Sequence, residues 1–169
     1  MKDYLTDSIY KLNRKVNYIN EINLQDKERL FNLIEYVDTA FEMTVQERLK
    51  RDKPRRGEIW LCNFGINVGS EICKVRPAIV TQVNDLNDKL PTTIVMPITS
   101  KSAHHDTEFA ILTEYLIENC FENDVTGSAS AVQTRNVSIG RLFKKIGELN
   151  EVGLNIMDEK ILRVMGIAI

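Results

Sequence analysis

The first 53 residues of the chain contain no glycine and no proline, whereas the remainder holds all eight glycines and all four prolines. A segment without these two residues lacks the usual helix breakers. The chain also has no apolar run long enough to cross a bilayer, and no apolar stretch follows Lys2 as a signal peptide would require. We therefore expect a cytoplasmic protein that makes no use of a membrane.

Cysteine and histidine are scarce. The three cysteines are Cys62, Cys73 and Cys120, none of them forms a Cys-x-x-Cys pair, and there are two histidines. Such scattered ligands make a poor structural zinc site, and an odd number of cysteines in a cytoplasmic chain favours reduced thiols. We expect no bound metal and no cofactor.

Positive charge is missing from one long stretch, because residues 102–134 contain six acids and no Lys or Arg. The net charge of the whole chain is −2, which argues against a protein that wraps duplex DNA by bulk electrostatics. Local clusters of basic residues on a weakly acidic protein suit a short anionic strand better than a long one. Three such clusters occur: Lys53, Arg55 and Arg56; Lys74 and Arg76; and Arg135, Arg141, Lys144 and Lys145.

The segment without glycine and proline carries apolar residues at helical spacing. Steps of three and four residues place them on one face of a helix, so the sequence predicts two helices within residues 1–53, ended by Pro54. The pattern fits either a hairpin that packs on itself or on the core, or an arm that binds a partner or a second copy. The first stripe is Leu5, Ile9, Leu12, Val16 and Ile19, and the second is Leu30, Leu33, Ile34, Val37, Phe41, Val45 and Leu49.

Residues 54–169 change to a period of two and to short apolar runs separated by turn formers. Short strands joined by turns and followed by a helix predict a small antiparallel β-barrel. With the helical segment in front, the expected fold class is α+β. The predicted strands are 58–64, 77–83, 93–99, 108–112 and 129–134, and the predicted closing helix is 151–165.

Two of the predicted strand ends carry residues that can bind an anion. Arg76 follows a Gly69-Ser70 loop and precedes Pro77, which favours extended backbone at Arg76. Its planar guanidinium at a strand mouth suits a phosphate, although from residue chemistry alone a surface arginine paired with an acid is the more ordinary reading. Further on, a buried strand runs out into Thr99-Ser100-Lys101, where hydroxyls and an ammonium can grip an anion or simply form a turn.

Several motifs follow one another in a fixed order: Arg-Gly-Glu-Ile-Trp at 56–60, Gly-Ser-Glu at 69–71, Val-Arg-Pro at 75–77, Pro-Ile-Thr-Ser-Lys at 97–101, and Gln-Thr-Arg-Asn-Val at 133–137. Together they resemble the MazF/PemK/Kid toxins of type II toxin–antitoxin systems. The resemblance covers residues 54–169. It does not cover residues 1–53, which the typical member of the family lacks.

The resemblance implies a CcdB-like, SH3-like barrel with a C-terminal helix that forms a homodimer. It also implies an endoribonuclease, an mRNA interferase that cleaves single-stranded RNA at short motifs without metal, and a cognate antitoxin as partner. The matching positions assign the catalytic residues as Arg76 and Thr99. The RNA-binding residues would be Ser70, Glu71, Lys74, Lys101, Gln133 and Arg135.

The residues fit this chemistry only in part. RNA supplies its own nucleophile, the 2′-hydroxyl, so the enzyme must align it and stabilise charge at phosphorus. Arg76 can stabilise charge but is too basic to be a good proton acceptor. Val132 stands where some members carry an acid, and Ser130 where a Kid-like member carries arginine. The general base stays unassigned. His104 and His105 are adjacent in a polar loop, and we interpret them as solvated.

Two other functions share this fold and stay open at this point. One is a non-catalytic poison of DNA gyrase, which would not need Arg76 or Thr99. The other is an inactive module that only binds its antitoxin. All matched motifs begin after residue 53, and residues 1–53 have ten basic and ten acidic residues. We therefore expect two domains, 1–53 as a helical extension and 54–169 as the toxin domain, and expect a chain starting near Lys53 to keep its activity.

Overall fold

The computed structural model describes residues 2–19, 24–49, 53–99, 110–112, 117–118, 125 and 127–167. Lys101, the pair His104-His105 and Cys120, which the sequence singled out, lie outside the described residues. The chain forms two compact units, Met1–Ala40 and Phe41–Ile169. The boundary between them falls inside a helix, and each unit is considered by itself below.

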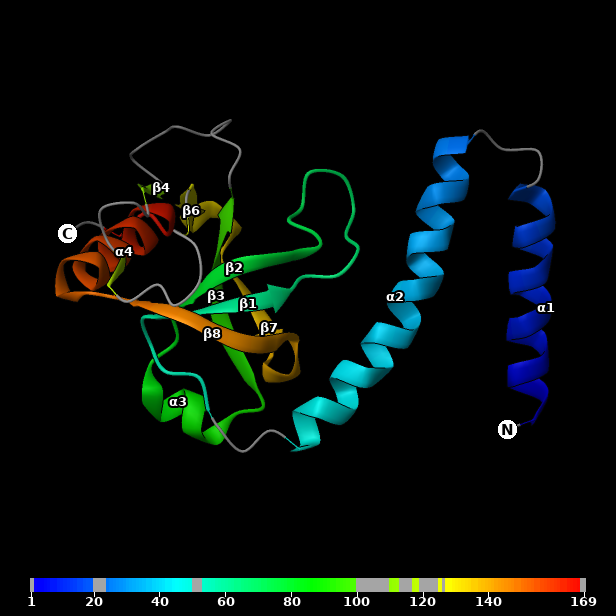
Figure 1. Cartoon of the computed structure of the whole chain (residues 1–169), viewed down its shortest axis with the longest axis horizontal. Coiled ribbons are helices and arrows are strands. Elements are labelled where there is room, and N and C mark those ends of the chain that lie inside the picture. Colours follow the sequence, from blue (N-terminus) through cyan, green and yellow to red (C-terminus); the bar gives the residue numbers. More distant parts are fainter. Residues whose placement is uncertain are drawn as a thin grey trace. The chain divides into compact units, whose positions relative to one another are not determined.

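Both predicted N-terminal helices are confirmed. Helix α1 spans Lys2–Ile19 and helix α2 spans Leu24–Leu49 (Figure 1). Apolar side chains of α2 at four-residue spacing are exposed, among them Val37 and, at 72% of its surface, Phe41. Within the described residues, neither these helices nor any other is both long and apolar enough to cross a membrane.

The last turns of α2 belong to the second unit and touch it directly. The Ser138 hydroxyl donates a hydrogen bond to the Glu47 carboxylate. Gly140 lies against the backbone of the same turns, where a Cβ would collide with the Met43 carbonyl oxygen. A glycine at position 140 therefore allows α2 to approach the chain just before the last strand.

The second unit is built on an antiparallel sheet with the strand order β4-β6-β3-β2-β1-β8-β5, and β7 pairs with the other part of β3 (Figure 1). This confirms the predicted antiparallel, barrel-like sheet. Its strands are β1 (Glu58–Asn63), β2 (Val75–Val80), β3 (Thr92–Thr99), β4 (Ala110–Leu112), β5 (Ile117–Glu118), β6 (Ser128–Ser130), β7 (Arg135–Ser138) and β8 (Leu142–Leu149).

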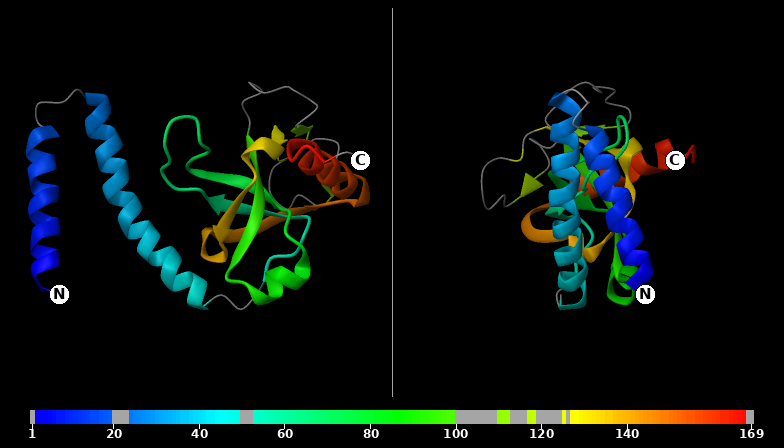
Figure 2. Two further views of the ribbon diagram at one scale, coloured as in Figure 1. Left: turned by 180° about the vertical axis from the view of Figure 1, so that it is seen from behind. Right: turned by 90° about the vertical axis from the view of Figure 1, so that its right-hand side faces the viewer.

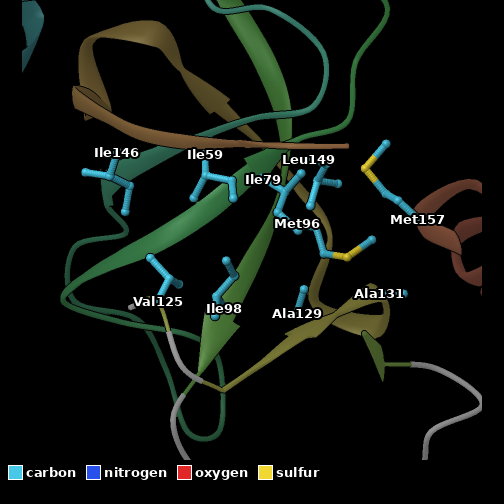
Figure 3. Packing of buried hydrophobic residues seen from close by; sticks show 10 residues of the cluster. All are labelled: Ile59, Ile79, Met96, Ile98, Val125, Ala129, Ala131, Ile146, Leu149 and Met157. Carbon is cyan, nitrogen blue, oxygen red and sulfur yellow. The ribbon is translucent and has the colours of Figure 1, made fainter. Parts of the chain in front are cut away.

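Alternate residues of the central strands enter two apolar clusters, one on each side of the sheet. Ile59, Ile79 and Met96 belong to the first cluster, which Figure 3 shows in close view. Their neighbours Trp60 and Val80 belong to the second. A shift of one residue in any of these strands would exchange the two sets, so burial on both sides fixes the register.

Helix α4 (Glu151–Val164), predicted as the closing helix, covers the first cluster with Met157. The Asn150 side chain caps it by accepting from Gly153 N at 2.8 Å. Figures 1 and 2 show α4 near the end of β3 that pairs with β6, and the short helix α3 (Asn84–Lys89) near the other end. Full burial of an apolar side chain such as Met157 contributes about 1.5–3 kcal/mol.

The predicted strand 129–134 is wrong in its second half. Strand β6 ends at Ser130, the 3₁₀ turn η2 (Ala131–Gln133) follows, and β7 begins at Arg135. The reason lies in β3, which pairs with β7 from Thr92 to Val95 and with β6 at Ile98 and Thr99. Between these two stretches β3 changes partner, and the chain linking β6 to β7 leaves the sheet as η2.

Candidate functional site

The connection between β1 and β2 is a structured loop that projects from the sheet (Figure 1). Lys74 N donates to Gly65 O at 2.8 Å, which closes its base. The Asn67 side chain bridges the interior by donating to Phe64 O at 3.0 Å and Ile72 O at 2.6 Å. Gly69, with φ +60°, forms the turn near the tip. These bonds hold the exposed Ser70 and Glu71 side chains on a defined support.

An open groove of about 550 Å³ lies between this loop and the η2–β7 segment. Four of the sequence-predicted RNA-binding residues meet here, Ser70 and Glu71 on the loop side and Gln133 and Arg135 on the other. They come from positions more than 60 apart in the chain. The departure of η2 from the sheet creates the second wall, so the feature that the strand prediction missed is the one that shapes the groove.

Arg76, the predicted catalytic cation, is half-buried at the start of β2. Its Nε donates to Cys73 O at 2.9 Å, a bond that orients the guanidinium. Among the described residues no carboxylate forms an ion pair with it, in contrast to Arg55, which pairs with Asp88 at 2.9 Å. The ordinary reading of a surface arginine neutralised by an acid therefore finds no support in the described part of the chain.

Thr99, the predicted catalytic hydroxyl, is half-buried at the end of β3 and pairs with Ser128 of β6. The β2–β3 register sets Ala78 opposite Pro97. Continued by two residues, this register would set Arg76 opposite Thr99, at the mouth where β2 and β3 separate. The two predicted catalytic residues thus stand at one end of two adjacent strands, although they are 23 positions apart in the sequence.

Lys74 is exposed and has a φ of +67°, a conformation that residues other than glycine seldom adopt. It lies two residues before Arg76, at the backbone hydrogen bond to Gly65 that closes the β1–β2 loop. Lys101 falls outside the described residues.

Three further groove residues were missed by the sequence reasoning: Ile72, Val132 and Thr134. Thr134 carries an unusual feature that it shares with Gln133. The oxygens Gln133 Oε1 and Thr134 Oγ1 are buried and have no hydrogen-bond partner in the described part of the chain. Buried polar atoms in folded proteins are nearly always paired, so two adjacent exceptions in the groove wall mark this wall as incomplete on its own.

The main network of charged groups among the described residues surrounds Glu58, the first residue of β1. Its carboxylate accepts from Arg55 N at 2.8 Å, Trp60 Nε1 at 2.9 Å and Lys145 Nζ at 2.9 Å. Burial alone would raise the pKa of Glu58, but these bonds outweigh it and hold the pKa below its ordinary value. A carboxylate tied by three donors is a structural group and a poor proton acceptor.

The same network acts on Lys145. Burial alone would lower the pKa of Lys145, but hydrogen bonds to Glu148 and Glu58 raise it above its ordinary value. The described cysteines, Cys62 and Cys73, are not in disulfides. In the described part of the chain, no group of three or more His, Cys, Asp or Glu residues is arranged to hold a metal ion.

Comparison with known proteins gives one family. The model of the PemK-like, MazF-like toxins of type II toxin–antitoxin systems matches residues 55–165. No match is found among curated proteins.

Solved structures agree with the family match in fold. A MazF from Deinococcus radiodurans is 21% identical, over 69% of this chain and 99% of that one, with a TM-score of 0.58. An endoribonuclease from a mycobacterial species is 14% identical, over 70% and 96%, with a TM-score of 0.55. The MazF of a MazE–MazF complex from D. radiodurans is 22% identical, over 69% and 100%, with a TM-score of 0.53. The family model covers well over half of the chain, and the chain therefore belongs to the PemK-like, MazF-like toxins of type II toxin–antitoxin systems.

Proposed function

We propose that this toxin is a metal-independent endoribonuclease that cleaves single-stranded mRNA at short sequence motifs. The observation that carries the proposal is Arg76, a guanidinium oriented by the Cys73 carbonyl and without a carboxylate partner among the described residues. An arginine held in this way offers its remaining N–H groups to a phosphate. The similar fold of an endoribonuclease from a mycobacterial species supports the same reaction class.

The reaction we propose is an internal transesterification. The 2′-oxygen of one nucleotide attacks the adjacent phosphorus, its proton passes to a base, and the bond from phosphorus to the 5′-oxygen breaks as that oxygen gains a proton. The products are a 2′,3′-cyclic phosphate and a 5′-hydroxyl. Arg76 stabilises the charge that develops on the phosphoryl oxygens, and Thr99 donates a hydrogen bond to one of them. No described residue is assigned as the base.

The groove between the β1–β2 loop and the η2–β7 segment is the proposed binding site for the RNA strand. Ser70 and Glu71 line one wall, and Gln133 and Arg135 line the other. Arg135, like Arg76, forms no ion pair among the described residues, and Lys74 is exposed at the base of the loop. These cations supply a local positive field on a protein whose net charge is −2. Lys101 completes the set on the evidence of the sequence motif alone.

The decisive experiment incubates the purified toxin with a long single-stranded RNA, with and without EDTA, and determines the chemistry of the new ends. We expect cleavage in both reactions and 5′-hydroxyl ends. Arg76→Ala is the test variant, and Arg55→Ala is the matched control because Arg55 is a surface cation paired with Asp88. A requirement for Mg²⁺, or 5′-phosphate ends, would refute the mechanism. No cleavage by the wild-type protein would favour the gyrase poison or the antitoxin-binding module.

We further propose that the toxin is a homodimer and that its cognate antitoxin occupies the same groove. The solved MazE–MazF complex of D. radiodurans, which has this fold, supports an antitoxin as partner. A carboxylate-rich antitoxin segment would find complementary charge at Arg76 and Lys74. The antitoxin should then compete with RNA, and sedimentation of the free toxin should give twice the mass of one chain. A ternary complex that cleaves RNA at the full rate would contradict the shared groove.

A further inference from the structure

We propose, resting on the function proposed above, that Gln133 and Thr134 read one nucleobase of the bound RNA through its exocyclic amino group. Adenine, cytosine and guanine carry such a group, and uracil does not. The toxin would therefore require an amino-bearing base at one position of its cleavage motif and disfavour uracil there.

The unpaired oxygens of Gln133 and Thr134 carry this inference. In the described residues these are the buried side-chain polar atoms left without a hydrogen-bond partner, and both residues line the groove. Two buried residues of the same types in this fold do have partners, which they reach through their donor groups. The buried Gln82 donates to Asn87 Oδ1 at 2.9 Å, and the Thr93 hydroxyl donates to the same oxygen at 2.8 Å. Both groove oxygens are buried, so each gains a partner from a ligand only when its side chain turns toward the groove.

The backbone holds these two residues in place from both sides. Thr134 N donates to Ala131 O at 3.1 Å, which closes the η2 turn before it. Arg135 pairs with Val95 of β3 directly after it. Only the side chains are left to adjust, and the terminal torsion of a glutamine is soft, so its amide can turn the oxygen toward the groove. The backbone support is therefore fixed, and only the two side chains must turn to meet a ligand.

The chemistry of the two atoms selects the ligand group. An amide oxygen only accepts hydrogen bonds, and a threonine hydroxyl accepts as well as donates. An exocyclic amino group has two N–H donors that can serve both oxygens. Uracil presents a carbonyl oxygen where cytosine presents the amine. The Thr134 hydroxyl can donate to that carbonyl, but the Gln133 amide oxygen would face a second acceptor. Across the groove, Glu71 adds a further acceptor. Single-stranded RNA is read by such contacts because its base edges are free.

The experiment measures binding rather than cleavage, so that it does not depend on the reaction. The cleaved motif is mapped on a long RNA, or a random pool is selected for binding if no cleavage occurs. Short oligonucleotides of that sequence are then made with 2′-O-methyl riboses, which prevents attack by the 2′-oxygen. Each amino-bearing base is replaced in turn by its analogue without the amine: adenine by purine, cytosine by 2-pyrimidinone and guanine by hypoxanthine.

For the wild-type full chain we expect one such replacement to weaken binding by about tenfold. In Thr134→Val, which keeps the shape of the side chain but removes the hydroxyl, the same replacement should change binding much less, because the contact is already lost. Thr134→Ser should restore the discrimination. Asn136→Ala, an exposed change on β7 away from the groove lining, should leave it intact.

Two results would overturn the proposal: no amine replacement affects wild-type binding, or the loss is equally large in the wild type and in Thr134→Val. The outcome is separable from that of the proposed function. Cleavage of RNA without amine discrimination would leave the nuclease standing and remove the base-reading role. Amine discrimination without cleavage would leave the base-reading role standing and remove the nuclease.

Discussion

Two regions of the same sheet differ in whether their charged and polar groups have partners. At Glu58, three donors satisfy one carboxylate, and Lys145 is shared between Glu58 and Glu148. Arg76, at the start of β2, has no carboxylate partner among the described residues, and in the same part of the chain the groove oxygens of Gln133 and Thr134 have no hydrogen-bond partner. Paired groups stabilise the fold but have nothing left for a ligand. Groups left unpaired contribute less to stability and are free to take a hydrogen-bond or ion-pair partner from a ligand.

The largest effect on activity is expected from removing the side chain of Arg76. We expect Arg76→Ala to lower the rate of RNA cleavage by about 100- to 1,000-fold, the usual effect of losing one oriented donor to a transition state. Thr99→Ala should act in the same direction. The midpoint of thermal unfolding should stay close to that of the wild type, because among the described residues the Arg76 side chain makes one hydrogen bond, to Cys73 O. Both variants folded and cleaving at the wild-type rate would disprove the assignment.

The opposite result is expected when the paired region is changed. Lys145→Met leaves Glu58 without its cationic donor and should lower the free energy of unfolding by about 1.5–3 kcal/mol, measured by urea denaturation. Cleavage by the folded protein should stay near the wild-type rate. The matched control is Arg163→Met, because Arg163 pairs with Glu159 one helical turn away on an exposed face. That change should cost no more than about 0.5 kcal/mol. Equal losses in the two variants would remove the distinction.

Lowering the pH should show how much the Glu58 network contributes to the free energy of unfolding. The pKa of Glu58 in the folded protein lies below its ordinary value, so the unfolded chain binds this proton first as the pH falls. The contribution of Glu58 to stability is complete above the ordinary glutamate pKa and is lost as the pH falls through the lower pKa of the folded state. Unfolding followed against pH should therefore show a shallower loss in Glu58→Gln than in the wild type. Parallel curves would mean that Glu58 does not contribute.

The smallest effect concerns the N-terminal helices. We propose that residues 1–53 are not needed for the chemistry, so a chain that starts at Lys53 should still cleave RNA. It should be less stable than a chain that starts at Phe41 by about 1 kcal/mol, because it lacks the hydrogen bond between Ser138 and Glu47. Comparison of the two chains by urea denaturation and by cleavage rate separates stability from activity. A folded, dimeric but inactive chain from Lys53 would place the helical segment in the active site.

The sequence was sufficient for the features that depend on local patterns. The apolar stripes predicted α1 and α2, and the alternation in 58–64 and 93–99 predicted β1 and β3. The ordered motifs predicted that residues near 70 and near 133 would serve one site, and the groove brings Ser70 and Glu71 together with Gln133 and Arg135. The proposed catalytic roles of Arg76 and Thr99 stay predictions.

Features that depend on tertiary packing could not be predicted. A strand from 129 to 134 satisfies local alternation, and only the change of partner along β3 explains why η2 interrupts it. No helix was expected between the second and third predicted strands, where turn formers stand, yet α3 forms there because the buried Asn87 side chain bonds to Gln82 and Thr93. Thr134 was missed because a missing hydrogen-bond partner is visible only once every neighbour is placed.

Proline at position 97 has a consequence for how the strands find their alignment during folding. Thr81 N donates to Ile94 O, so with the regular alternation of antiparallel pairs the Pro97–Ala78 pair is one whose nitrogens face away from each other. The donor that Pro97 lacks is thus missing on the side where β3 passes from β7 to β6. A slip of one residue would bring the proline ring into a position that needs an N–H and would also exchange Val95 and Met96 between the two clusters. Misaligned pairings of β3 are penalised twice, which favours a single register for the strands that frame the groove.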